Sequence, residues 1–269
     1  MKNLLYVTMI YILFPLLLVC FIQKNTVWNN VDTDTALAYL LYLECPKESC
    51  YEAIKAQTVL LRSNLSLFSK EEWNELIKKS ASIEQKKEYK KVKNTYFTAI
   101  ADTENLVLKS NGKIVRGVYH EISAGMTRDG TYTGKKEYEQ LSSVVSSWDM
   151  QSPGYLQVFS FSDQYLKHHF FENQDDPQIS VLLVDNGKYV QMAQWGNTYV
   201  NGDFVRDSLS LPSAAFTIIY QDKQWIFTCK GVGHGLGMSL YGANVLAKQG
   251  KTFQEILKYY FPNYDILSK

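Results

Sequence analysis

The chain has 269 residues, 46% hydrophobic and 20% charged, so it can fold around a sizeable core and is not expected to be disordered. Its 28 Lys and Arg residues nearly balance 27 Asp and Glu residues, and the formal charge is +1. This balance does not indicate a basic surface for a phosphate backbone, so nucleic acid is not an expected partner. The lysine-rich run at residues 78–93 has too few apolar residues for a core and predicts a solvated helix face.

An uncharged apolar stretch at residues 4–22 comes first along the chain. Its length is close to the roughly 20 residues that cross a bilayer, and it lacks the small residues of a signal-peptidase site. We therefore expect a retained transmembrane anchor at residues 1–25, a polar juxtamembrane linker at 26–34 and one extracytoplasmic domain at 35–269.

The cysteines and histidines do not predict a metal site. Cys45 and Cys50 can close a small disulfide loop outside the cytoplasm, and whether they are bridged stays open. They have no second cysteine pair or spaced histidines to complete four ligands. His168 and His169 are interpreted as exposed neighbours on a loop, so we expect no metal and no cofactor.

The remaining elements follow from hydrophobic periodicity and capping residues. Helices are expected at residues 51–65 and 70–79, the second with a Ser69–Glu72 capping box. β-Branched and aromatic runs then predict a hairpin at 106–115 and strands at 156–161, 180–184, 198–200, 216–220 and 225–228. Helical spacing returns at 238–248 and 253–260, the latter with a Thr252–Glu255 capping box. The order predicts an α+β fold with mostly antiparallel strands between N-terminal and C-terminal helices, preceded by the transmembrane helix.

The most unusual segment, residues 231–243, places five glycines around His234 and continues into Ser239 and Tyr241 at the start of a helix. Glycine allows positive φ and close approach of another chain, and helix-start amides can donate hydrogen bonds. A dinucleotide-binding interpretation is rejected because the required strand, helix and later acidic residue are not evident. Taken alone, His234 is as consistent with a buried structural imidazole as with a catalytic one.

An earlier segment supplies the second motif: Glu44, Pro46, the sequence Glu-Ala-Ile-Lys-Ala-Gln at residues 52–57, and Arg62. Together with Gly-His-Gly-Leu-Gly-Met-Ser-Leu-Tyr-Gly-Ala at 233–243, it resembles the stage II sporulation protein D family, membrane-anchored lytic transglycosylases related to amidase enhancers. Residues 120–127 and the run 206–216 also resemble family motifs, so the resemblance covers about residues 40–262. Leu240 stands where the family has glutamine, and cysteines of some relatives are missing, so their structural metal is not predicted here.

The resemblance implies a lytic transglycosylase that cleaves the β-1,4 bond between N-acetylmuramic acid and N-acetylglucosamine in peptide-stripped glycan strands and leaves 1,6-anhydro ends. Glu44 matches the catalytic position and would act first as acid and then as base. A single carboxyl suffices, because the C6 hydroxyl of muramic acid attacks C1. Leu43 and Tyr42 are expected to keep Glu44 protonated by desolvation.

Substrate contacts are expected from the same motifs, within one glycan-binding cleft. The expected residues are Ser239, Tyr241, Gln57, Arg62, His234, Ser123 and Thr127. A structural alternative stays open for each of them, and Arg62 and Lys55 are as consistent with salt bridges as with orienting Glu44 or a lactyl group.

The resemblance further implies a single-pass protein of the mother-cell membrane whose catalytic domain faces the forespore septum. There it would degrade septal wall during engulfment, together with a wall amidase and that amidase's membrane partner. Sporulation and another wall-remodelling task are not separated by the residues themselves.

Three other functions are weighed against this one. A non-catalytic wall-binding enhancer of an amidase would need no acid at Glu44. An ordinary glycoside hydrolase would need a second carboxyl, with Glu121 or Asp149 as the candidate. A serine triad around Ser239 and His234 lacks both the Gly-x-Ser-x-Gly elbow and a third partner.

Overall fold

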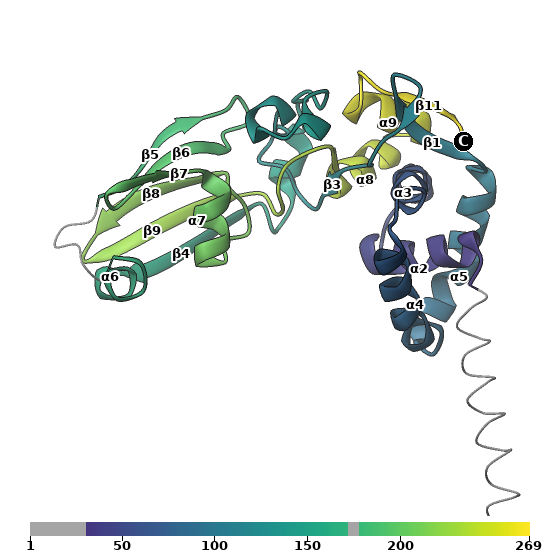
Figure 1. The fold of residues 1–269 in the computed structure, drawn as a ribbon, viewed down its shortest axis with the longest axis horizontal. Coiled ribbons are helices and arrows are strands. Elements are labelled where there is room, and N and C mark those ends of the chain that lie inside the picture. Colours follow the sequence, from purple (N-terminus) through teal and green to yellow (C-terminus); the bar gives the residue numbers. More distant parts are fainter. Residues whose placement is uncertain (1–30, 172–177) are drawn as a thin grey trace, which may run out of the picture.

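A computed structural model describes residues 31–171 and 178–269, which form two lobes joined by a middle segment (Figure 1). The helices are α2 (Thr33–Glu44), α3 (Tyr51–Leu65), α4 (Lys70–Glu84), α5 (Lys87–Asp102), α6 (Asp163–Phe170), α7 (Gly202–Leu209), α8 (Leu240–Lys248) and α9 (Phe253–Tyr260), with short 3-10 helices η1 (Gly130–Thr133), η2 (Lys136–Tyr138) and η3 (Ser147–Gln151). The strands are β1 (Leu106–Ser110), β2 (Lys113–Ile114), β3 (Tyr119–His120), β4 (Leu156–Ser162), β5 (Ile179–Val184), β6 (Val190–Trp195), β7 (Thr198–Val200), β8 (Phe216–Gln221), β9 (Gln224–Lys230), β10 (Met238–Ser239) and β11 (Asp265–Ser268). The fold is α+β with antiparallel sheets, which confirms the predicted class.

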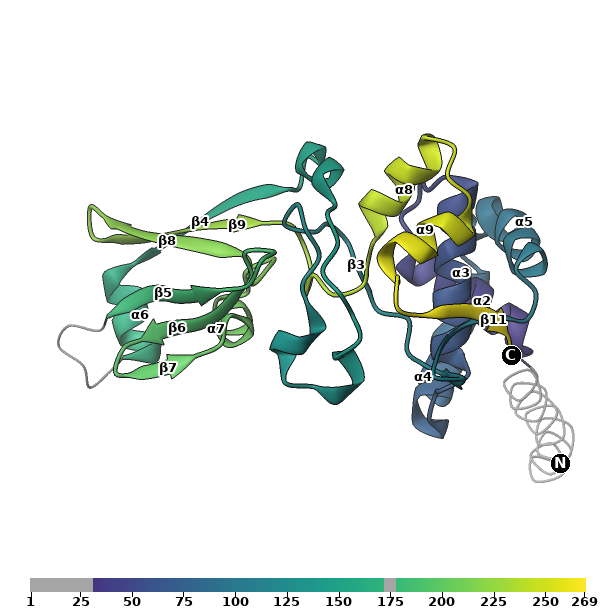
Figure 2. The ribbon, with the colours of Figure 1, turned by 90° about the horizontal axis from the view of Figure 1, so that it is seen from above.

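The two lobes divide the elements by type (Figure 2). Helices α2–α5, α8 and α9 gather with the small sheet β11-β1-β2 in a helical lobe. The sheets β4-β9-β8 and β5-β6-β7 form the other lobe with α6 and α7. The single domain expected at residues 35–269 is thus built as two lobes, and α2 begins at Thr33, two residues before that boundary.

Helix α3 is the central element of the helical lobe because it contributes to two hydrophobic cores. Its Ile54 and Leu61 pack with residues of α2, α4 and α5. Its Ala56 and Leu60 pack on another side with residues of α8, α9 and β1. The helix buries most of its length, and the predicted bounds 51–65 are confirmed. Both predicted capping boxes, at Ser69 and Thr252, are also formed.

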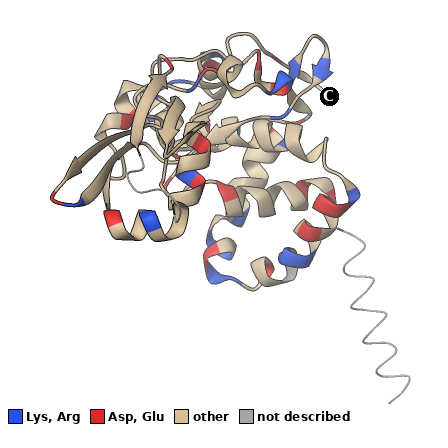
Figure 3. Ribbon diagram, turned by 60° about the vertical axis from the view of Figure 1, so that its left-hand side comes forward, with Lys and Arg blue, Asp and Glu red and all other residues tan. Residues whose placement is uncertain are grey.

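The lysine-rich run at residues 78–93 spans the end of α4 and the start of α5. The expectation that it holds too few apolar residues for a core is wrong, since Ile83 and Tyr89 within the run are buried in the core around α2. The ring of Tyr89 packs against Tyr39, with centroids 5.6 Å apart. The charged residues of the run lie on the outer side, where Lys93 pairs with Glu84 at 3.0 Å. Figure 3 accordingly shows both charge signs mixed along these helices.

The sheet lobe buries an aromatic core between its two sheets, including Phe216, Phe227 and Trp195. The expected strands at 156–161, 180–184, 198–200, 216–220 and 225–228 are confirmed as β4, β5, β7, β8 and β9. The interpretation of His168 and His169 as loop residues is wrong. They lie in α6, whose N-cap Ser162 accepts a hydrogen bond from the amide of Tyr165 at 3.1 Å.

The lobes meet at a short parallel strand pair in the middle of the molecule. Strand β10 pairs with β3 in the register Met238 opposite Tyr119 and Ser239 opposite His120. The glycine-rich segment reaches this pairing by very close packing. A Cβ on Gly237 would overlap the carbonyl oxygen of Val118, and Gly237 has a φ of +69°. These glycines therefore bring another part of the same chain close.

Two histidines are held in this junction by the main chain of Leu236. The Nδ1–H of His120 donates to the carbonyl of Leu236 at 2.9 Å, and the amide of Leu236 donates to Nδ1 of His234 at 3.1 Å. Burial, followed by the proximity of His234, lowers the pKa of His120 to about 3. Burial, followed by Arg206, lowers the pKa of His234 to about 4. Both rings are therefore neutral at physiological pH.

The expected transmembrane anchor at residues 1–25 lies outside the described residues, as does most of the linker at 26–34. Among the helices of residues 31–171 and 178–269, none combines the length and hydropathy needed to cross a bilayer.

Substituting Gly237 by alanine should destabilise the fold by about 2 kcal/mol more than the same change at Gly134. The two glycines have nearly equal φ, +69° and +68°, but a Cβ at Gly134 would meet nothing within 4 Å. Gly134→Ala thus measures backbone strain alone, and Gly237→Ala adds the clash with Val118. Urea unfolding of both variants tests this, and equal losses would contradict the packing role of Gly237.

The buried histidines should make the protein less stable in acid. An unfolded histidine binds its proton below about pH 6.5, whereas His120 in the native state stays neutral down to about pH 3. Stability is therefore lost as pH falls below 6.5. Between pH 5.5 and 4.5, His120→Asn should reduce the slope of unfolding free energy against pH by about 1.4 kcal/mol per unit. Asparagine can keep the bond to Leu236 without titrating. His168→Asn, on an exposed position, is the control, and an unchanged slope in His120→Asn would count against this account.

Candidate functional site

Glu44 is the last residue of α2, and its side chain is exposed. It lines a hollow of about 400 Å³ at which three separate parts of the chain meet. The lining residues are Leu43, Glu44, Cys45 and Pro46 from the end of α2, Tyr119, His120 and Glu121 from β3 and the residue after it, and Leu240 at the start of α8. The hollow therefore depends on the β3-β10 pairing, which places two of these parts side by side.

Within the hollow, Tyr119 is the hydrogen-bonding neighbour of Glu44. Burial, followed by the charge of Glu44 and this hydrogen bond, raises the pKa of Tyr119. The tyrosine hydroxyl therefore stays protonated in the neutral range and donates to the carboxylate. The site thus pairs an exposed carboxyl group with a fixed donor.

The expected desolvation of Glu44 by its sequence neighbours is wrong. Leu43 is 42% exposed. Tyr42 packs in the opposite core, where its ring centroid lies 5.5 Å from that of Tyr89. Helical geometry explains this, because successive residues of α2 project about 100° apart and Tyr42 points into the helical lobe while Glu44 points out.

Cys45 and Cys50 flank the turn between α2 and α3 as free thiols. Burial raises the pKa of Cys45 to about 11, so this thiol is neutral. The amide of Cys50 donates to the side chain of Asn244 at 2.6 Å, which ties the start of α3 to α8. Among the described residues, no group of three His, Cys, Asp or Glu side chains could hold a metal ion.

The motif on α3 lies inside the helical lobe. Gln57 is fully buried, with its side-chain amide unpaired in the interior. Arg62 is 6% exposed, and its guanidinium donates to the carbonyls of Ile100, Thr103 and Leu106 at 2.6–3.1 Å. These bonds satisfy the end of α5, whose last carbonyls have no helical partner. The motif therefore holds helices together at positions where a sugar contact was expected.

Glu52 and Lys55 complete this structural role. Glu52 pairs with Lys55 at 2.5 Å and also accepts a hydrogen bond from the amide of Phe253 at 2.7 Å. Phe253 is the first residue of α9, so the carboxylate of Glu52 caps that helix start. Lys55 lies on this side of the helix, over the rings of Tyr51 and Phe253.

Ser123, Thr127 and Ser239 are also buried, at or below 1% exposure. Ser239 caps α8 by accepting from the amide of Gly242 at 3.0 Å. Thr127 accepts from the amide of Val144 at 2.9 Å. Ser239 therefore fixes the start of α8, which contributes Leu240 to the hollow, and Thr127 fixes the main chain at Val144.

Asp149 is the buried carboxylate beneath these serines. It accepts from the amide of Ser123 at 2.8 Å, and burial raises its pKa against the opposing hydrogen bonds from Ser123, Ser239 and Ser146. Because Asp149 is fully buried, it does not face the hollow. Its role is to join the segments that carry Ser123 and Ser239.

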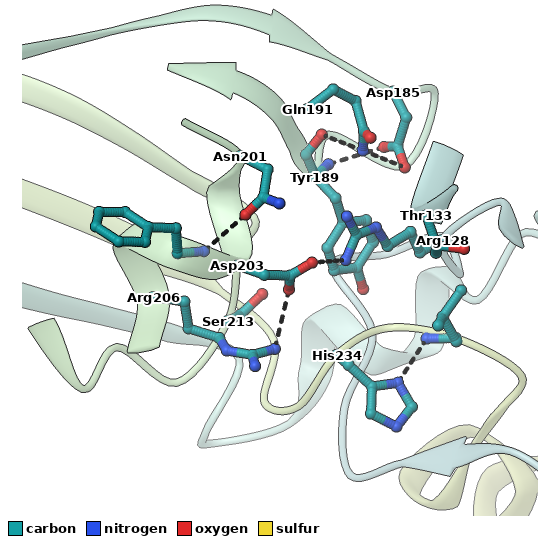
Figure 4. Close-up of polar contacts among 12 residues, drawn as sticks. Arg128, Thr133, Asp185, Tyr189, Gln191, Asn201, Asp203, Arg206, Ser213 and His234 are labelled. Carbon is teal, nitrogen blue, oxygen red and sulfur yellow. Dashed lines mark hydrogen bonds and ion pairs between the residues drawn. The ribbon is translucent and has the colours of Figure 1, made fainter. Parts of the chain in front are cut away.

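Tyr241 and His234 keep partly exposed side chains. Tyr241 follows the hollow-lining Leu240, and its amide donates to the carbonyl of Glu121 at 3.0 Å. His234 lies on the sheet-lobe side of the junction, near an ion-pair chain (Figure 4). There Asp203 bridges Arg128 at 2.7 Å and Arg206 at 3.2 Å. Tyr241 thus follows a lining residue without lining the hollow itself, and His234 lies beside His120, with ring centroids 6.0 Å apart.

Sequence reasoning missed Tyr119 and His120 as members of the site. The signal that could have found them is the segment 120–127, which begins with His120 and directly follows Tyr119. What was missing was the pairing partner, since a parallel bridge of two residues leaves no periodic pattern. Glu121 was considered only as an alternative carboxyl, and the structure puts it in the same hollow as Glu44.

Comparison with known proteins adds evidence of kinship. No family model matches the chain. Stage II sporulation protein D of Bacillus amyloliquefaciens is 27% identical over 263 residues, covering 88% of this chain and 75% of that protein. Stage II sporulation protein D of Bacillus subtilis (strain 168) is 30% identical over 165 residues, covering 61% of this chain and 48% of that protein.

A shorter similarity links the chain to the amidase enhancer of Bacillus subtilis, 38% identical over 56 residues, which is 21% of this chain and 8% of that protein. The two longer matches carry one name, and the first extends over most of the described residues. These two matches agree with the motif resemblance described above, and residues of those motifs line the hollow or hold its walls in place. These similarities support an assignment of the chain to the stage II sporulation protein D family.

Proposed function

We propose that this protein is a peptidoglycan lytic transglycosylase and that Glu44 is its catalytic residue. The observation that carries the proposal is the exposed Glu44 carboxyl in a hollow of about 400 Å³, with Tyr119 as its hydrogen-bond donor. The volume falls within the range of small-molecule sites, roughly 300–1,000 Å³. The names of the two longer relatives add a role in sporulation.

The reaction needs one group that both gives and takes a proton. Protonated Glu44 gives its proton to the glycosidic oxygen as the bond from C1 of N-acetylmuramic acid to that oxygen breaks. The C6 hydroxyl of the same sugar then bonds to C1, and its proton passes to the Glu44 carboxylate. The products are a 1,6-anhydro end and a free sugar hydroxyl, and Glu44 is again protonated. No water molecule and no cofactor are consumed.

Among the other expected contacts, Tyr241 is our candidate for touching the sugar. It is partly exposed and follows Leu240 in the wall of the hollow. Its aromatic ring offers a face for a sugar ring and its hydroxyl offers a hydrogen bond. Ser123, Thr127, Ser239, Gln57 and Arg62 are buried, so we assign them roles in the fold in place of contacts with the sugar.

The cellular setting is part of the proposal. Residues 1–25 would anchor the protein in the mother-cell membrane, with the two lobes facing the forespore septum. The substrate would be septal glycan already stripped of peptides by a wall amidase, with which this protein and a membrane partner would act during engulfment. The short match to an amidase enhancer supports a link to an amidase, and also keeps a non-catalytic enhancer as the alternative.

A second enzymatic function is favoured by one observation, the presence of Glu121 in the same hollow as Glu44. Glycoside hydrolases place two carboxyls on either side of the bond, one as acid and the other as base or nucleophile. Glu121 is exposed and could take that second role. Asp149 could not, because it is fully buried.

Glu44→Gln should abolish product formation, with a loss of at least about 1,000-fold, because glutamine cannot give a proton. The measurement is mass spectrometry of the fragments released from peptide-free glycan, with 1,6-anhydro ends expected from the wild type. Glu48→Gln, an exposed neighbour outside the hollow, is the control and should stay active. Glycan binding that persists in Glu44→Gln separates loss of chemistry from loss of folding.

Three results would redirect the proposal. Reducing ends in place of anhydro ends would identify a hydrolase. Full activity in Glu44→Gln would remove Glu44 from the site. Binding of glycan by the wild type with no cleavage, together with stimulation of an amidase, would identify an enhancer.

Glu121→Gln distinguishes the two enzymatic mechanisms by rate. A transglycosylase needs no second carboxyl, so this variant should keep its anhydro products and lose less than about 10-fold in kcat. A two-carboxylate hydrolase would lose on the order of 1,000-fold. The same fragment assay gives both the rate and the type of end.

A further inference from the structure

We propose that Tyr119 is the positioning residue of Glu44, whose hydroxyl holds the carboxyl group and stabilises the carboxylate formed when Glu44 gives up its proton. This inference rests on the proposed function and deepens it. Tyr119 acts through Glu44 and need not touch the sugar. Its distinguishing feature is that it shares the hollow with Glu44 although 75 residues separate them in sequence.

The position of Tyr119 is fixed by the surrounding fold. It lies in β3 directly opposite Met238 of β10. Its half-buried ring packs against both hydrophobic cores of the helical lobe, the one around α2 and the one around α8 and α9. A ring held on two sides loses little further entropy when its hydroxyl bonds Glu44, and it cannot swing away without opening both contacts.

The charge states of the other groups around Glu44 are compatible with a hydrogen bond from the Tyr119 hydroxyl to the Glu44 carboxylate. The other titratable residues of the hollow are Cys45 from the end of α2, and His120 and Glu121 from the β3 segment, while α8 contributes Leu240. Cys45 and His120 are neutral near pH 7, since burial raises the pKa of the thiol to about 11 and lowers that of the imidazole to about 3. Glu121 is therefore the other ionisable group whose charge acts on Glu44 from the lining of the hollow.

The hydrogen bond should strengthen during the reaction. A bond from a hydroxyl to a carboxylate is about twice as strong as one between neutral groups. When Glu44 gives its proton to the glycosidic oxygen, negative charge develops on the carboxyl group to which Tyr119 donates. An interaction that grows toward the transition state raises kcat, whereas one that is equal in both states lowers only KM.

The test compares two tyrosine-to-phenylalanine variants of the full-length protein. Tyr119→Phe removes the hydroxyl beside Glu44. Tyr39→Phe is the matched control, because its hydroxyl also donates to a glutamate, Glu84, at 3.0 Å, and it lies on α2 away from the hollow. Tyr119→Phe should lower kcat on the order of 10- to 100-fold with KM within about twofold, the effect of losing one hydrogen bond to a charged group. Tyr39→Phe should leave both constants unchanged.

The pH profile adds a readout that a purely structural role would not move. Glu44 must begin each cycle protonated, so activity is expected to decline at high pH. Losing a donor to the carboxylate favours the protonated form. The descending limb of the kcat profile in Tyr119→Phe should therefore move to higher pH by about one unit, while Tyr39→Phe should keep the wild-type limb. An unchanged limb and kcat in folded Tyr119→Phe would overturn the proposal, as would equal losses in both variants.

A measurement without turnover separates this inference from the proposed function. NMR titration of ¹³C-labelled glutamate carboxyls, with the Glu44 signal assigned by its absence in Glu44→Gln, follows the same group directly. The Glu44 signal should titrate at higher pH in Tyr119→Phe than in the wild type. A shifted signal in a protein that makes no anhydro ends would keep the Tyr119 contact and reject the transglycosylase. Anhydro ends together with an unshifted Glu44 signal would keep the transglycosylase and reject the Tyr119 contact.

Discussion

The parallel pairing of β3 with β10 is the contact on which the site depends. It is only two residues long, yet it places Tyr119, His120 and Glu121 beside the start of α8. Backbone hydrogen bonds this few could not hold two segments without further support. The support comes from glycines that let the chains approach, and from the buried Asp149, which accepts a hydrogen bond from the amide of Ser123 and interacts with Ser239 on the inner side.

Many residues of the strongest sequence motifs stabilise the fold and take no direct part in the proposed chemistry. Arg62 closes the end of α5, Glu52 caps α9, and the glycines remove side chains where two backbones meet. A residue can belong to a motif because its structural role allows no other residue type. A buried arginine that donates to three carbonyls has such a role. Glu44 differs from these because it is exposed and carries no comparable structural bond in the core.

Local signals predicted the elements well where capping and periodicity were strong. Helix α3, the two capping boxes and most strands were predictable for that reason. Helix α6 was not, because its histidines were interpreted as loop residues, and the start of α5 was expected only as a solvated helix face although Tyr89 is buried there. Glu44 was identifiable by motif resemblance, whereas Tyr119 was not, since its neighbour in space lies 75 residues away in sequence and only tertiary packing brings them together.

The residues that line the hollow also show which part of the molecule does not contribute to it. It comes from residues 43–46, 119–121 and 240, so the strands from β4 to β9 contribute nothing to it. Those strands lie between β3 and β10 along the chain, and β3 and β10 are themselves paired. The sheet lobe is therefore an insertion between β3 and β10, and the pairing of these two strands brings its beginning and its end together. Such an arrangement lets the inserted part diversify in size and surface while the carboxyl and its neighbours stay in register.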